Sequence, residues 1–198
     1  MNSVTPPNES TPYESGVELT EEQRVYIDAA SKYHSKHLES SDDGGKFVAN
    51  CNLGICAGLL GDYAAAATHH QDALRIAIRM QSFAGQSVAV GNLGLLSIKQ
   101  SDYATAKACL QQHLQLTQSL RDINGECNAW TLLGEVALAT SEFDDAIHCL
   151  EQGRNVAEAN GMIGHMKRIS CAIGMALANS KMDANFASIA EMAATKSD

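Results

Sequence analysis

Small and apolar residues recur along this chain with a period of forty residues. The segment Asn-Leu-Gly at 52–54 returns at 92–94, Leu-Leu-Gly stands at 132–134, and Gly174 occupies the same repeat position. A short polar turn, an aromatic residue and a run of small residues follow each of the first three segments. Internal similarity at a fixed period of 20–50 residues is typical of stacked structural repeats. The pattern therefore predicts a repeat architecture.

Within each repeat, the spacing predicts two helices that form a hairpin. A Gly inside a helix costs about 1 kcal/mol relative to Ala, so its recurrence in the first helix predicts a close crossing. The expected partner is the Ala that follows twelve residues later, and the aromatic residue that opens the second helix is expected to fill the gap between neighbouring hairpins. First helices are expected near 46–60, 86–100 and 126–140, and second helices near 63–80, 103–119 and 143–160. The predicted packing residues are Gly54, Tyr63, Ala66, Gly94, Tyr103, Ala106, Gly134, Phe143 and Ala146.

Turn and cap residues predict where these helices begin. Asp62 and Asp102 precede the aromatic residue and suit an N-cap, where a carboxylate favours the positive end of the helix. In the third repeat Ser141 or Glu142 takes that place. Residues 40–45, Ser-Ser-Asp-Asp-Gly-Gly, are expected to form a flexible joint.

The ends of the chain depart from the repeat. Residues 1–18 are polar and contain all three Pro, and they are expected to be a disordered or partner-ordered tail. Residues 19–40 begin with a capping box from Thr20 to Gln23 and are expected to form an N-terminal capping helix, a solitary second helix. A fourth first helix is expected at 164–179. Residues 183–198 are then expected to form a separate, degenerate C-terminal helix and tail.

The small-residue pattern resembles the tetratricopeptide repeat family, with a Gly in the first helix and an Ala early in the second. The forty-residue spacing, with Asp-Ile-Asn-Gly-Glu at 122–126, resembles the Leu-Gly-Asn (Pins) type. The signature Trp of the first helix is present as Trp130 but is replaced by Asn50 and Val90, and the Pro that ends repeats of this family is missing. The resemblance implies an all-α, right-handed α-α superhelix, with about three full hairpins plus capping helices. The repeats would span 46–85, 86–125, 126–165 and a partial 166–182 within residues 46–182.

Charge and composition limit the classes of partner and the location that are expected for this chain. The formal net charge of −9 disfavours a nucleic-acid partner or an anionic membrane surface, both of which need clustered Lys and Arg. No run of eighteen apolar residues exists to span a membrane, and the N-terminus lacks the regions of a secretory signal, so a cytoplasmic location is expected. Cytosolic thiols stay reduced, and Cys109 and Cys149, one repeat apart, are expected to be small buried hydrophobic residues.

No catalytic or cofactor-binding motif is found, so no enzyme, cofactor or small-molecule substrate is predicted. The chain has neither a Gly-rich phosphate loop nor a nucleophile elbow. His34 and His37 share a helix face, and His69 and His70 on the next second helix are the nearest further ligands. A stable zinc site needs three or four ligands of suitable geometry. A solvated helix edge explains these residues better, and no metal is expected.

The resemblance implies that first helices line a concave, partner-binding face. The implied positions are Val48, Cys51, Asn52, Ile55, Val88, Asn92, Leu95, Lys99, Asn128, Leu132 and Glu135. Recurring Asn residues would bond to the backbone of a bound segment, although Asn at any one position equally suits a solvated helix surface. A carboxylate-clamp function is disfavoured, because Asn92 matches that clamp but Cys51, Ile55 and Leu132 do not.

The sequence thus predicts a non-enzymatic scaffold or adaptor that binds a peptide or helix of another protein. The alternative is a structural subunit of a large cytoskeletal or ciliary (axonemal) assembly. A metal-dependent switch built on the His residues is a third and more distant class.

Overall fold

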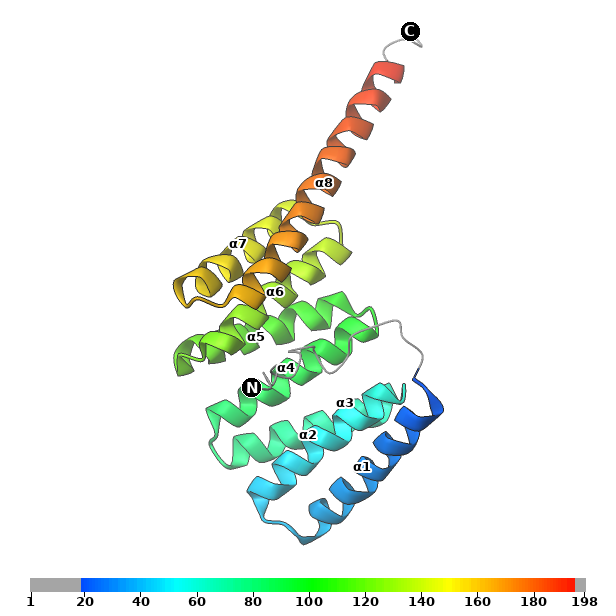
Figure 1. Ribbon diagram of the computed structural model, residues 1–198, viewed down its shortest axis with the longest axis vertical. Helices are drawn as coiled ribbons and strands as arrows, with labels where there is room; N and C mark the ends of the chain where they lie inside the picture. Colours follow the sequence, from blue (N-terminus) through cyan, green and yellow to red (C-terminus); the bar gives the residue numbers. More distant parts are fainter. Residues whose placement is uncertain (1–18, 195–198) are drawn as a thin grey trace, which may run out of the picture. The chain divides into compact units, whose positions relative to one another are not determined.

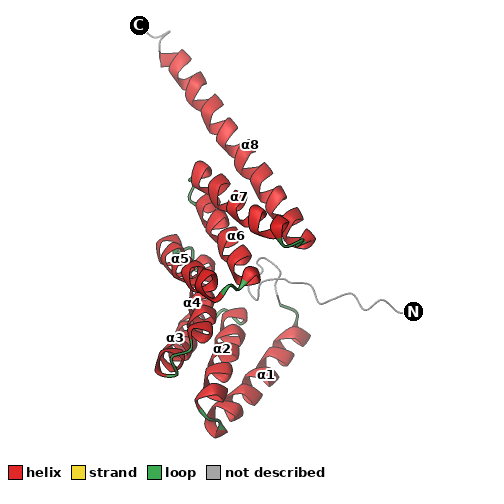
Figure 2. Cartoon of the chain, turned by 90° about the vertical axis from the view of Figure 1, so that its left-hand side faces the viewer, coloured by secondary structure: helices red, strands yellow, loops and turns green. Residues whose placement is uncertain are grey.

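The computed structural model describes residues 19–194, and that part of the chain is built from helices without strands (Figure 1). Figure 2 shows these helices joined by short turns. Their bounds are α1 Glu21–Ser40, α2 Asp43–Leu59, α3 Tyr63–Arg79, α4 Phe83–Lys99, α5 Tyr103–Leu120, α6 Ile123–Ala139, α7 Phe143–Ala159 and α8 Ile163–Ala194. The expected all-α fold of helical hairpins is confirmed. The prediction for residues 1–18 lies outside the described residues.

The chain divides into two compact units, one up to Asp102 and one from Tyr103 onward. In the first unit, α1 packs on α2, α2 on α3 and α3 on α4, and the alternate helices α2 and α4 also touch. The second unit repeats this scheme with α5 on α6, α6 on α7, α7 on α8, and α6 touching α8. Each helix is therefore stabilised mainly by its neighbours, as expected for stacked repeats.

The first helices begin three residues earlier than predicted, because polar residues upstream of the expected starts cap them. Asp42, Ser82 and Asp122 accept hydrogen bonds from the backbone N–H groups three residues on, at Gly45, Gly85 and Gly125. Asp42 is thus an N-cap, and the expected flexible joint at 40–45 is wrong.

The Gly three residues after each of these caps lies where the preceding helix approaches. A Cβ on Gly45 would lie 3.2 Å from His37 Nε2, and one on Gly85 would lie 3.0 Å from the Ala77 Cβ. One on Gly125 would lie 2.6 Å from Thr117 Cγ2. The same contact thus recurs every forty residues, between the last turn of one helix and the first turn of the next.

The remaining caps follow the prediction in part. Asp62 accepts a hydrogen bond from the Ala65 N–H at 2.9 Å and caps α3 as expected. Glu142 is the N-cap of α7, but its side chain makes no capping bond. Its carboxylate instead pairs with Lys107 at 2.8 Å, and this hydrogen bond raises the pKa of Lys107.

One turn geometry links helix to helix. A residue with positive φ stands every twenty positions, and the residue after it bonds back to a carbonyl of the previous helix, as from Asp62 N to Ala57 O at 2.9 Å. This is the Schellman arrangement. Two of these residues are Gly61 and Gly161, whereas Gln81, Ser101, Arg121 and Ser141 adopt the same left-handed backbone with a side chain.

We expect Gly61→Ala to lower the free energy of unfolding by about 1–2 kcal/mol, because a Cβ disfavours the left-handed conformation. The φ of Gly61 is 86°, and a Cβ added there would meet nothing within 4 Å, so backbone strain is the whole effect. The reverse change, Ser141→Gly, relieves the same strain and is expected to stabilise by about 0.5–1 kcal/mol. Urea denaturation measures both. Equal signs for the two changes would contradict this account.

α8 differs from the prediction, because it continues without a break from Ile163 to Ala194. No positive-φ residue interrupts it near Lys181, where the twenty-residue rhythm would place a turn. The first helix of the fourth repeat and the expected separate C-terminal helix are therefore one element. Gly174 occupies the repeat position of Gly54 and Gly134, yet it is exposed and a Cβ there would meet nothing within 4 Å.

Candidate functional site

Gly54 and Gly134, two of the recurring Gly residues of the first helices, make close helix crossings, and the side chain nearest to each is not the predicted Ala. A Cβ on Gly54 would collide with the His70 ring, and one on Gly134 would lie 2.5 Å from Leu150 Cγ. Ala66 and Ala146, the expected partners, are fully buried and lie one turn earlier on the same helices. For both Gly54 and Gly134 the nearest side chain is therefore the one sixteen positions later, and the expected partner of Gly134 adds a contact through the Ala146 carbonyl oxygen at 3.3 Å.

The other predicted packing residues occupy equivalent places in their helices. Gly94 and Ala106 are buried, in α4 and α5 respectively. Tyr63, Tyr103 and Phe143 each open a helix and are half-buried.

His70 replaces a core leucine. It is 0% exposed and takes the position that Leu110 and Leu150 occupy in later repeats, where both are also 0% exposed. Burial in this apolar site, with a smaller contribution from neighbouring His69, lowers the pKa of His70 from 6.5 to about 4. The imidazole is therefore neutral at pH 7 and is part of the core.

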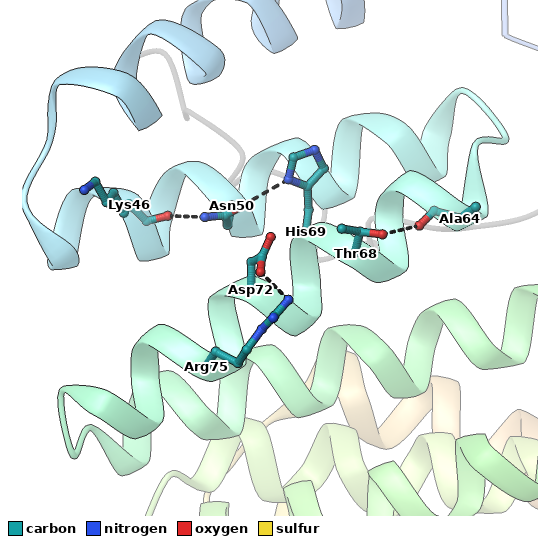
Figure 3. Close-up of polar contacts among 7 residues, drawn as sticks. All are labelled: Lys46, Asn50, Ala64, Thr68, His69, Asp72 and Arg75. Atoms are coloured by element: carbon teal, nitrogen blue, oxygen red, sulfur yellow. Dashed lines mark hydrogen bonds and ion pairs between the residues drawn. The ribbon is translucent and has the colours of Figure 1, made fainter.

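A second buried polar residue of this hairpin, Asn50, stands at the repeat position that Trp130 occupies eighty residues later (Figure 3). Asn50 is 4% exposed; its Nδ2 donates to the Lys46 carbonyl at 2.9 Å. Its Oδ1 lies 3.0 Å from His69 Nδ1. Because Oδ1 can only accept, this arrangement requires a proton on His69 Nδ1. The hydrogen bond between Asn50 and His69 links α2 to α3.

Most of the predicted partner-binding residues of the first unit lie at least partly exposed on α2 and α4. Val48 and Val88, one repeat apart, are 46% and 48% exposed. The half-buried members of this set are Asn52, Ile55, Asn92, Leu95 and Lys99. Together, the exposed face of α2 and α4 offers apolar side chains interleaved with amides.

Cys51 is a correction to that set. It is 7% exposed and packs with Ala73, Ala89 and the half-buried Phe47 and Leu74. The thiol thus joins three helices of the core and is inaccessible to a partner. Burial raises its pKa to about 11, so it stays protonated.

In the second unit the corresponding face is more polar. Asn128 and Glu135 are half-buried, and Glu135 Oε1 accepts a hydrogen bond from Arg168 Nη2 at 2.9 Å, joining α6 to α8. Leu132 is 7% exposed and is a second correction, because its side chain belongs to the core. The sequence reasoning missed Arg168, which stands forty residues after Asn128 and eighty after Val88.

The cysteines are free thiols with different exposures. Cys56 and Cys127 are buried, and Cys171 is exposed. Cys109 and Cys149 are half-buried rather than buried as predicted. Desolvation, aided by the charge of Asp145, raises the pKa of Cys149.

Ligand chemistry is sparse in the part of the chain that the structure describes. No three His, Cys, Asp or Glu side chains there are grouped closely enough to hold a metal ion. Over the same residues, no helix combines the length and the apolar character needed to cross a membrane.

Comparison with known proteins identifies the repeat. No curated protein matches the sequence. The family model described as tetratricopeptide repeat matches residues 86–184, which is half of the chain and covers α5, α6 and α7 in full. With the hairpins, the close Gly crossings and the forty-residue period in agreement, the chain belongs to the tetratricopeptide repeat family.

Proposed function

We propose that this protein is a non-enzymatic scaffold that binds an extended segment or a helix of another protein on α2 and α4. Tetratricopeptide repeats generally mediate protein–protein interaction. The observation that carries the proposal is the pair Val48 and Val88, nearly half exposed at one repeat position on neighbouring first helices.

The chemistry around these two valines suits a peptide. The half-buried Asn52 and Asn92 place an amide beside each valine, and an amide can both donate to and accept from a peptide backbone. Ile55 and Leu95 add apolar surface one turn further along each helix. Backbone bonds to the amides would give affinity, and the apolar side chains would select the residues of the partner.

The corresponding face of the second unit, on α6 and α8, is less suited to an apolar peptide because it is more polar. There Glu135 and Arg168 already satisfy each other, and a partner would have to compete with that ion pair. We therefore place the main binding energy on the first unit. The net charge of −9 favours a protein partner over nucleic acid or an anionic membrane.

A peptide library displayed on phage and selected against the immobilised full chain tests the proposal. Selected peptides, measured by fluorescence polarisation, are expected to lose at least about tenfold in affinity, or about 1.4 kcal/mol, with Val48→Glu plus Val88→Glu. Ile78→Glu is the matched control, because Ile78 is 55% exposed on α3, away from this face. Selection that yields no binder, or peptides that bind the double variant as well as the wild type, would overturn the proposal.

A further inference from the structure

α1 carries two exposed tyrosine rings on the face that later second helices bury. Tyr26 is 65% exposed and Tyr33 is 72% exposed. α1 is in register with the repeats, because the contact between its last turn and Gly45 recurs forty residues later at Gly85. Positions 26 and 33 therefore correspond to Ala66 and Ala73, both 0% exposed in α3.

Apart from His37, whose ring lies against Gly45 of α2, this face is exposed or half-buried within the described residues, and its side chains differ from those that pack against a repeat helix. In α3 and α7 this face lies against a first helix at the close crossings of Gly54 and Gly134. Ala occupies position 66 and its equivalent at 146, whereas α1 has Tyr26 there. A helix that approached α1 as closely would meet this ring, so the occupant must pack around aromatic side chains.

The residues along this face are spaced symmetrically about its centre, with Tyr26 and Tyr33 on either side of Ala29 and Ala30. Three- and four-residue steps keep them on one side of the helix, and Tyr26 Oη donates to Glu22 Oε1 at 3.1 Å along that side. In order they are Glu22, Tyr26, Ala29, Ala30, Tyr33 and His37. Turned end to end, the series sets Glu22 against His37, Tyr26 against Tyr33, and Ala29 against Ala30.

We propose that α1 pairs antiparallel with α1 of a second copy of this chain through this face. Charge complementarity favours that occupant, because Glu22 in the first turn would lie near Lys36 and His37 at the end of the other helix. The small Ala29 and Ala30 at the centre let the two helices approach closely. The tyrosines of the two copies then stack in pairs on either side of the crossing.

Such a contact is small. A single helix pair buries less surface than the 1,200 Å² or so that marks a standard interface. The dimer is therefore transient, with a Kd on the order of 10 µM. The contact is isologous, so each half of the helix face meets the other half of its twin.

Sedimentation velocity on the full chain from about 1 to 300 µM, a range that brackets this Kd, tests the pairing. We expect reversible dimerisation in the wild type and at least tenfold weaker association, about 1.4 kcal/mol, for Tyr26→Ser plus Tyr33→Ser. Glu22→Lys alone weakens the dimer, and adding His37→Glu to the same chain restores it, because the introduced cation and the introduced anion then face each other across the two copies. Phe83→Ser is the matched control, since Phe83 is 62% exposed on α4 and its removal leaves the dimer unchanged.

Photochemical dityrosine cross-linking, followed by peptide mass spectrometry of the dimer band, reports the orientation. An antiparallel pair gives a link from Tyr26 to Tyr33 between copies. A Tyr26–Tyr26 link as the main product would overturn the proposal. A wild type that stays monomeric over the whole range would also overturn it, whether residues 1–18 or a different protein cover the face, as would a dimer unaffected by the tyrosine changes.

Discussion

Leu150→Ala is expected to lower the free energy of unfolding by about 3–5 kcal/mol, because it leaves a cavity in a fully packed core. Leu150 is 0% exposed and packs in a cluster with Ile169 and Ile173. Gly134→Ala is expected to cost about 1–3 kcal/mol by overpacking, since the new Cβ would lie 2.5 Å from Leu150 Cγ. Urea titration followed by circular dichroism measures both changes.

The two changes are expected to couple when combined. The methyl group of Gly134→Ala enters the space that Leu150→Ala opens, so the double variant loses at least about 1 kcal/mol less than the sum of the single variants. Gly174→Ala is the matched control at the same repeat position, where a Cβ meets nothing within 4 Å. It is expected to stabilise by up to about 1 kcal/mol through helix propensity. Strict additivity of the pair, or a destabilising Gly174→Ala, would contradict the assignment.

The second large effect is a loss of folding stability at acidic pH that arises from His70. Its pKa is about 4 in the folded chain against 6.5 when solvated, so the unfolded chain binds more protons between these values. Stability contributed by the neutral imidazole is therefore complete above about pH 6.5 and falls as the pH drops towards 4. The loss approaches about 3 kcal/mol, at 1.36 kcal/mol for each pKa unit.

His70→Leu is the variant that isolates this contribution, because Leu occupies the same place at Leu110 and Leu150. The difference in unfolding free energy between wild type and variant, measured by urea titration at pH 7.5, 6, 5 and 4.5, is expected to widen steadily in favour of the variant. Subtraction removes the titration of the other His and carboxyl groups. A difference that stays constant with pH would show that His70 accepts its proton in the folded chain as easily as in water.

The sequence was sufficient for the helical hairpins and their period, because Gly, Ala and aromatic residues at fixed spacing report where helices cross. It placed the first helices three residues too late. Gly45 was taken as part of a flexible joint, whereas Gly45, Gly85 and Gly125 each follow an N-cap and accommodate the neighbouring helix. The sequence alone does not distinguish a Gly required for close helix packing from a Gly in a flexible joint, because the difference depends on whether a neighbouring helix lies against it.

The candidate site was predicted less well for a geometric reason. First helices touch other helices on several sides, since α2 packs against α1, α3 and α4, and only a narrow strip is left accessible. Val48 and Val88 lie on that strip, whereas Cys51 and Leu132 are turned into the core. His70 was weighed as a metal ligand, because the leucine-like role of a histidine is visible only when the position is compared with Leu110 and Leu150.

The geometry of the turns between the helices limits how the length of this chain can vary. In three of them one residue, Asp62, Ser82 or Asp122, both bonds back to the preceding helix through its backbone N–H and caps the next helix with its side chain. Inserting or deleting a single amino acid there would turn the following helix by about 100° and carry its buried stripe away from its neighbour. Ordinary surface loops tolerate such length changes, but these turns do not, because their residues are hydrogen-bonded to the helices on both sides. Related chains are therefore expected to differ in length by whole repeats rather than by single residues within these turns.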